Sequence, residues 1–300
     1  MVERRGALPP ARRLRAPHCL LLLLLVLIGA CTATADSGAV RGDADRRGVT
    51  RLGNQEPSSP DPAVAAGVRE AGGRADRIPG ATVGLAVLDR ESGRLVVGER
   101  ADEIFSSASI AKLFVASDVA TRRAEGLRVS EEDAELVRRA LSVSDDEAMN
   151  GLWERFDGPG AIDRISTRFG LTATAPPTVP GDWGGTRTSA RDVVTLLAGV
   201  ADLPADRRAP VLDPLDSAPR TAAEGFDQGY GLKSSDRPEA VKAGWMCCEG
   251  GRRTVHSAGL IGRDHRYAVA LLSSRPSSVD YSRSTGDLTE VAEPLLRRLG

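Results

Sequence analysis

The chain has 300 residues, of which 41% are apolar and 27% are charged, and its formal net charge is −1 at pH 7. This balance is typical of a soluble globular protein and excludes the compositions of disordered and fibrous chains. Because 41 acidic residues match 40 basic ones, we expect no basic surface and no nucleic-acid partner.

The first thirty residues, 1–30, have the pattern of an export signal. Several arginines precede an apolar run from Cys19 to Ala30, which is shorter than the roughly 20 residues that span a bilayer. The run ends in IGAC, residues 28–31, which resembles the lipobox of bacterial lipoproteins. The resemblance implies cleavage before Cys31, a lipid on its sulfur, and anchoring at the extracytoplasmic face of the cell membrane. The alternative is an ordinary secretory cleavage near Ala30 or Ala35.

Residues 31–61 are expected to form a flexible tether. Gly, Ser, Asp, Arg and Pro dominate there, so the segment cannot bury enough apolar surface to order itself. The remaining residues, 62–300, are enough for one domain with a sizeable core.

The two ends of this domain are expected to supply a sheet and its covering helices. A helix is predicted from Pro62 to about Ala75, followed by a hairpin over residues 81–99 whose apolar residues alternate. Residues 252–262 and 266–275 predict a second strand pair. The face of a final helix is marked by Leu288, Val291, Leu295 and Leu299.

The middle of the domain is predicted to be helical. Ser130 with Asp133 is typical of a capping box, and further helices are expected over 148–156, 162–169 and about 189–200. The sequence therefore predicts a mixed α+β fold. An antiparallel sheet flanked by terminal helices forms one wall of a cleft, and an inserted all-helical subdomain, approximately residues 118–200, forms the other.

A serine and a lysine near the start of a helix are candidates for nucleophilic chemistry. In FSSASIAK, Ser109 and Lys112 stand three residues apart, so their side chains are neighbours. A lysine amine can take a serine proton when desolvation or another cation lowers its pKa, whereas arginine cannot be deprotonated in a protein. The chain has only three lysines among its 40 basic residues, so a lysine here calls for a chemical reason.

Two further motifs follow in order. Ser144-Asp145-Asp146 is followed by Asn150 at a break between two helices, and Lys242-Ala243-Gly244 lies at the edge of the C-terminal sheet. S-x-x-K, S-D-N and K-T-G are the motif set of class A β-lactamases and penicillin-binding proteins. The region from about residue 62 to 299 resembles this superfamily in the order, spacing and surroundings of the motifs.

The resemblance implies a β-lactamase-like fold and four catalytic roles. Ser109 would attack an acyl carbon to form an acyl-enzyme, and Lys112 would take its proton. Ser144 would relay a proton to the leaving nitrogen, and Lys242 would supply positive potential for a substrate carboxylate.

The resemblance also implies binding positions. Backbone N–H groups of Ser109 and Trp245 match the oxyanion hole, and Asp146, Ala243 and Gly244 match substrate-binding positions. An ionised Asp146 accepts hydrogen bonds but cannot donate to a substrate carbonyl as asparagine does. Ala243 lacks the hydroxyl that would contact a ligand carboxylate. Both differences predict an altered ligand or lost activity.

The glutamate that class A β-lactamases use for deacylation has no counterpart. Pro180-Gly181-Asp182 is present, but Thr172 stands where that glutamate is expected, and no carboxylate occurs between Arg168 and Gly181. Water attack on a penicilloyl-enzyme should therefore be slow.

Three functions remain open at this point. The first is a serine hydrolase of the β-lactamase/D,D-peptidase type that acts on cell-wall peptide or β-lactam amides. The second is a β-lactamase with a displaced deacylation base. The third is a catalytically degenerate scaffold that binds a wall fragment or a protein partner.

Other chemistry finds little support in the sequence. No metal-ligand spacing, phosphate loop or dinucleotide fingerprint occurs, so no metal and no cofactor are expected, and the protein is expected to be a monomer. His256 is assigned to packing in a strand and Lys233 to the surface or a loop. Adjacent Cys247 and Cys248 could form a vicinal disulfide, remain free or bridge two molecules.

Overall fold

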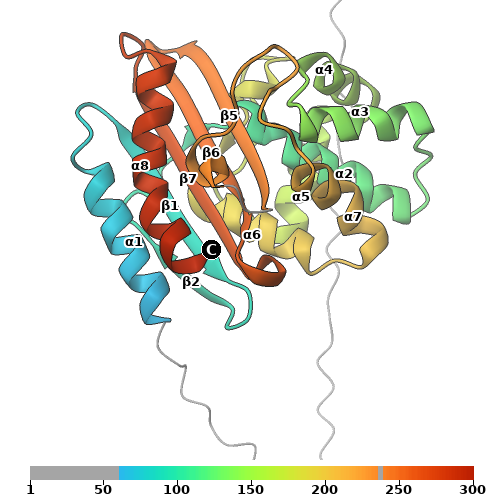
Figure 1. Cartoon of the computed structure of the whole chain (residues 1–300). Helices are drawn as coiled ribbons and strands as arrows, with labels where there is room; N and C mark the ends of the chain where they lie inside the picture. Colours follow the sequence, from blue (N-terminus) through green and yellow to red (C-terminus); the bar gives the residue numbers. More distant parts are fainter. Residues whose placement is uncertain (1–60, 236–238) are drawn as a thin grey trace, which may run out of the picture. The chain divides into compact units, whose positions relative to one another are not determined.

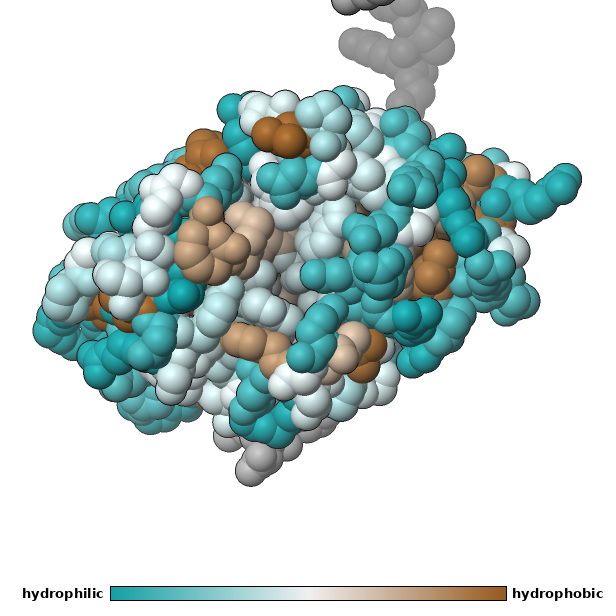
Figure 2. Space-filling model, turned by 90° about the horizontal axis from the view of Figure 1, so that it is seen from above, coloured by the Kyte–Doolittle hydropathy of each residue, from teal (hydrophilic) through white to brown (hydrophobic). Residues whose placement is uncertain are grey.

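The computed structural model describes residues 61–235 and 239–300 (Figure 1). The predicted signal peptide, the lipidation site Cys31 and nearly all of the predicted tether lie outside the described residues. No helix among those described is long and apolar enough to cross a membrane. Seen from above, apolar side chains occur as small separate patches on a mostly polar face (Figure 2).

One antiparallel sheet of five strands has the order β2-β1-β7-β6-β5 (Figure 1). The N-terminal and C-terminal parts of the described domain meet where β1 pairs with β7, with Leu85 opposite Leu271. Strand β5 lies at one edge of the sheet. The strands are β1 (Thr82–Asp89), β2 (Arg94–Val97), β5 (Ala240–Glu249), β6 (Arg252–Ile261) and β7 (Tyr267–Pro276).

Helices α1 (Pro62–Ala75) and α8 (Tyr281–Leu299) pack together on one face of this sheet (Figure 1). Each buries an apolar stripe at helical spacing, which includes Val64 and Val68 on α1 and Leu288 on α8. The predicted terminal helices therefore cover the sheet as expected.

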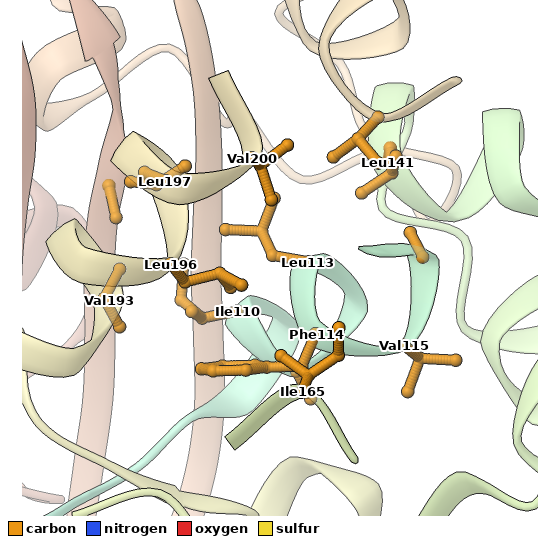
Figure 3. Close-up of a cluster of buried hydrophobic side chains, with 14 of the residues drawn as sticks. Ile110, Leu113, Phe114, Val115, Leu141, Ile165, Val193, Leu196, Leu197 and Val200 are labelled. Carbon is orange, nitrogen blue, oxygen red and sulfur yellow. The ribbon is translucent and has the colours of Figure 1, made fainter. Parts of the chain in front are cut away.

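The other face of the sheet is covered by α6, which contacts β1, β6 and β7. Figure 3 shows how α6 also joins the helical part: Val200 lies beside Leu113 of α2 and Leu196 beside Ile110, just before α2, within one buried cluster. The helices of this part are α2 (Ala111–Ala124), α3 (Glu131–Ser142), α4 (Asp146–Arg155), α5 (Gly158–Phe169), α6 (Ala190–Ala201) and α7 (Ala205–Asp216). The mixed α+β fold predicted from the sequence is thus confirmed.

Some elements were not predicted. Helix α7 contains Pro210 and Pro214, which remove backbone donors and obscure a helical pattern, yet it packs on α2 and α3. Two short strands, β3 (Phe105–Ser106) and β4 (Arg187–Thr188), pair next to the predicted nucleophile. Cys247 and Cys248 form a disulfide at the end of β5, one of the three states that the sequence left open.

A buried ion pair joins β7 to α8. Arg275 contacts Asp287, and both side chains are 5% exposed. Asp287 also accepts from Arg283 of its own helix at 2.9 Å. Removing one partner of such a pair leaves the other charge buried without compensation.

We therefore expect Asp287→Ala to lower the free energy of unfolding by about 3–5 kcal/mol, because Arg275 would stay buried without its carboxylate. Urea denaturation of the purified protein measures this loss. Glu135→Ala is the control, since it breaks an exposed pair with Arg138 and should leave the midpoint nearly unchanged. Equal urea midpoints for the two variants would show that the buried pair stabilises the fold no more than the exposed pair does.

Candidate active site

The predicted nucleophile lies in a short 3-10 helix, η1 (Ala108–Ile110), directly before α2. Ala108 has a φ of 46°, a left-handed conformation that costs energy in a residue other than glycine. The segment is held by Ser107, whose N–H donates to Thr186 O at 2.7 Å. This turn places the Ser109 hydroxyl beside the first turn of α2.

Lys112 of α2 is fully buried, and its amine is the centre of the site. Nζ donates to Ser109 Oγ at 3.0 Å and to Asp146 Oδ1 at 2.6 Å. It also lies 2.6 Å from Ser144 O and 3.2 Å from Ser144 Oγ. An ammonium has three N–H donors, so these four acceptors compete for its protons.

Two opposing effects act on the pKa of Lys112. Burial lowers it, because the charged form loses its water, and the Asp146 carboxylate opposes this by stabilising the ammonium. Burial prevails, so the pKa of Lys112 lies below its ordinary value. A neutral amine beside Ser109 Oγ is what general-base chemistry requires.

Ser144 lies between two lysines at the break between α3 and α4. Its φ of 55° and the Asp145 side chain, which accepts from Ala148 N–H at 3.0 Å, set the turn that opens α4. Lys242 Nζ donates to Ser144 Oγ at 2.8 Å from the edge strand β5. The hydroxyl therefore connects the amines of Lys112 and Lys242.

Lys242 is 1% exposed and also donates to Ala243 O at 2.8 Å. Burial and the neighbouring Lys112 and Lys233 lower its pKa well below the ordinary value. Its ammonium is therefore less stable than that of an exposed lysine, which does not favour the role towards a substrate carboxylate that the motif resemblance implied.

Lys233, which the sequence assigned to the surface or a loop, is more buried than a surface lysine. It lies in η3 (Gly231–Ser234), is partly buried, and donates to Ala218 O at 2.6 Å. Burial and the Arg220 cation lower its pKa to about 8. Lys112 and Lys233 both lower the pKa of Lys242, and the rarity of lysine in the sequence was the only signal of this grouping.

Strand β5 packs directly against η1, which brings Trp245 to the same junction as Ser109. Gly244 allows this approach, because a Cβ there would lie 3.2 Å from Ile110 Cγ1. The side chain of Ala243, however, is buried in the apolar cluster on the α8 side of the sheet. The structure therefore does not bring the Ala243 side chain to the other predicted site residues.

Asp146 begins α4 and faces Lys112, although its side chain remains 54% exposed. Its backbone N–H donates to Glu224 Oε1 at 3.3 Å. The residue that replaces the expected asparagine is thus the ion-pair partner of the predicted base, which the sequence did not reveal.

An aromatic ring comes from the loop where the glutamate is missing. Trp183 of η2 (Trp183–Gly185) places its ring centroid 4.8 Å from Lys112 Nζ. Its indole N–H donates to Asn150 Oδ1 at 2.9 Å. The backbone N–H of Thr172 donates to Asp192 of α6 at 3.3 Å. Sequence reasoning missed Trp183, although it follows Pro180-Gly181-Asp182 directly.

His256 of β6 contacts the segment just before the predicted nucleophile. Its Nδ1 accepts from Ser273 N–H at 3.1 Å, which places the proton on Nε2, and Nε2 donates to Ser106 O at 2.9 Å. Burial lowers the pKa of His256 to about 4, so the ring is neutral near pH 7. The packing role expected from the sequence agrees with these contacts.

This histidine predicts a pH-dependent stability. An unfolded imidazole binds a proton below its pKa of 6.5, whereas folded His256 does so only near pH 4, so the wild type should lose about 3 kcal/mol as the pH falls through this range. His256→Gln removes this linkage and should lose less over the same interval. Urea denaturation at pH 7, 5.5 and 4.5 compares them, and parallel losses would contradict the assignment.

Comparisons with known proteins show what the chain and its fold are similar to. No protein-family model matches the chain. The proteins named "Putative lipoprotein LppW" of Mycobacterium tuberculosis and Mycobacterium bovis are 37% identical to it over 213 residues, 69% of this chain and 67% of theirs.

Solved structures share the fold at lower identity. PBP-A has a TM-score of 0.63 at 19% identity, over 77% of this chain and 94% of that protein. A class A β-lactamase from Mycobacterium abscessus has a TM-score of 0.60 at 17% identity, over 77% and 98% of the two chains. The chain therefore belongs to the family of the mycobacterial LppW proteins, and it has the fold of class A β-lactamases and PBP-A.

Proposed function

We propose that this protein is a serine acyl-transfer enzyme of the D,D-peptidase type that forms a long-lived acyl-enzyme on Ser109 with cell-wall peptides and β-lactams. The observation that carries the proposal is the 3.0 Å contact between Ser109 Oγ and the buried amine of Lys112. The lowered pKa of Lys112 supports a neutral amine that can take the serine proton.

Acylation follows from the contacts around Ser144. Ser109 Oγ bonds to the acyl carbon while its proton passes to the neutral amine of Lys112. When the C–N bond breaks, the leaving nitrogen takes the proton of the Ser144 hydroxyl, and Lys112 returns its extra proton to Ser144 Oγ across 3.2 Å. Lys242 Nζ donates a hydrogen bond to the same oxygen at 2.8 Å, and this bond stabilises the negative charge that develops on Ser144 Oγ during the relay.

The same junction suits oxyanion stabilisation. Backbone N–H groups of Ser109 and Trp245 belong to η1 and β5, which pack against each other. Donors fixed by the backbone need no reorganisation as the negative charge forms, and losing one such donor costs about 2.7–4 kcal/mol of transition-state stabilisation.

Deacylation is expected to be slow. A water molecule that attacks the acyl carbon needs a base, and the loop that carries a glutamate in class A β-lactamases here presents the Trp183 ring to Lys112. The carboxylate that does contact Lys112, Asp146, is occupied by that ion pair. These features favour a persistent acyl-enzyme over rapid hydrolysis of an antibiotic.

Likeness to a known acyl-enzyme supports this reading. A solved structure of a PBP-A variant, with a TM-score of 0.62 and 20% identity, is an acyl-enzyme complex with penicillin G. The name of the mycobacterial relatives supports the lipoprotein part of the proposal, in which a lipid on Cys31 holds the enzyme at the outer face of the cell membrane.

A binding scaffold without turnover is the second candidate. The Lys112–Asp146 ion pair favours it, because a carboxylate 2.6 Å away stabilises the ammonium, the form that cannot act as a base. In that case the protein would hold a wall fragment or a partner without forming a covalent bond.

Intact-mass measurement after incubation with benzylpenicillin separates these functions. We expect an adduct of the whole penicillin that persists for hours and is absent from Ser109→Ala. Lys112→Arg keeps the charge but cannot accept a proton, so acylation should slow by about 10²–10⁴-fold. Ser282→Ala, an exposed serine at the start of α8, is the control and should form the adduct normally.

Two results would contradict the proposal. A folded protein that forms no adduct would favour the binding scaffold. An adduct lost within minutes while the antibiotic is consumed would identify a β-lactamase with a displaced base.

A further inference from the structure

The charges around the serine differ from those that suit a carboxylate-bearing ligand. The side chain of Asp146 is 54% exposed while one of its oxygens contacts Lys112, so the carboxylate can also meet a ligand. Glu224 lies beside it, accepting the Asp146 N–H at 3.3 Å. Both carboxylates are close enough to Lys112 and Lys242 to stabilise their charged forms. This side of the site is therefore negative.

The opposite charge is poorly available to a ligand. Lys242 is 1% exposed, and its amine is committed to Ser144 Oγ and Ala243 O at 2.8 Å each. Burial also disfavours its ammonium form, which lowers its pKa well below the ordinary value. The side chain at position 243 offers no hydroxyl and faces the other side of the sheet.

The catalytic step changes the charge beside Asp146. Lys112 takes the serine proton only as a neutral amine, and in that form it no longer neutralises the half-exposed carboxylate 2.6 Å away. A ligand ammonium at Asp146 would replace the lost charge. Lys112 would then release its own proton to water, because Asp146 would pair with the ligand ammonium and no longer stabilise the Lys112 ammonium.

Binding and activation are thereby coupled. A ligand cation that pairs with Asp146 weakens the attraction that raises the pKa of Lys112, and by linkage a neutral Lys112 strengthens cation binding. Asp146 repels a ligand anion. An anionic ligand therefore binds weakly and leaves the ion pair between Lys112 and Asp146 intact.

We propose that the site selects amides whose acyl part carries a free amine near the scissile carbonyl, either an α-ammonium or the side-chain ammonium of a diamino acid, which pairs with Asp146. The inference rests on the proposed acyl-enzyme function and names the class of substrate that this function serves. Such ligands are short peptides with an unblocked amine.

Three penicillins test this directly, because ampicillin, benzylpenicillin and carbenicillin differ at one carbon of the acyl side chain, which carries an ammonium, a hydrogen or a carboxylate. At pH 6.5, where an α-amine is charged, the second-order rate of acylation should fall in that order, with about a tenfold span between the first and the last. Intact mass against time measures each rate.

The variant Asp146→Asn separates the effect of charge at this position from the steric fit of the three penicillin side chains. The variant should remove the advantage of ampicillin and should speed acylation by benzylpenicillin, because Lys112 loses the carboxylate that holds its proton. The pH at which benzylpenicillin acylation is half-maximal should also move down. Glu147→Gln, the exposed neighbour on α4, is the charge-matched control and should keep the wild-type order.

The possible outcomes are distinct. Benzylpenicillin reacting as fast as ampicillin, or an unchanged order in Asp146→Asn, would overturn the proposal while leaving the acyl-enzyme intact. No adduct with any of the three penicillins would overturn the proposed function, and this inference with it.

Discussion

The site depends on the protonation of one buried amine. Lys112 has no exposed surface and is surrounded by Ser109, Ser144 and Asp146, each within hydrogen-bond distance. Desolvation favours the neutral amine and Asp146 favours the ammonium. Lys112 must be neutral to act as a base and charged to pair with Asp146, so it cannot do both at once. The proposed reaction therefore depends on what breaks the ion pair. This balance links the proposed reaction to the proposed choice of ligand.

The fold brings this amine and its partners together from distant parts of the chain. Helix α2 carries Lys112, the turn between α3 and α4 carries Ser144, and the edge strand β5 carries Lys242. Because β5 belongs to the sheet and the two helices to the other part, the cluster exists only when both are packed. The neutral His256 and the left-handed Ala108 hold the nucleophile turn between them.

The sequence predicted much of this because periodicity and motif spacing are local properties. Short segments of the sequence were enough to predict the strands of the sheet, the terminal helices and the Ser109–Lys112 pair. Helix α7 was not, since its two prolines break the pattern that packing on α2 and α3 overrides. Three contacts of the site could not be predicted, because each joins residues that are far apart in the sequence. They are those of Lys233 with Lys242, of Trp183 with Lys112, and of Asp146 with Lys112.

A direct titration of Lys112 tests the central claim. The chain has three lysines, so protein labelled with ¹⁵N-lysine gives few side-chain signals, and Lys112→Arg identifies the one that matters. Following the Nζ signals by NMR as the pH is raised should show Lys112 losing its proton at a lower pH than an exposed lysine, whose pKa is 10.5. A Lys112 that titrates at or above 10.5 would mean that Asp146 outweighs burial, and the lysine could not serve as the base.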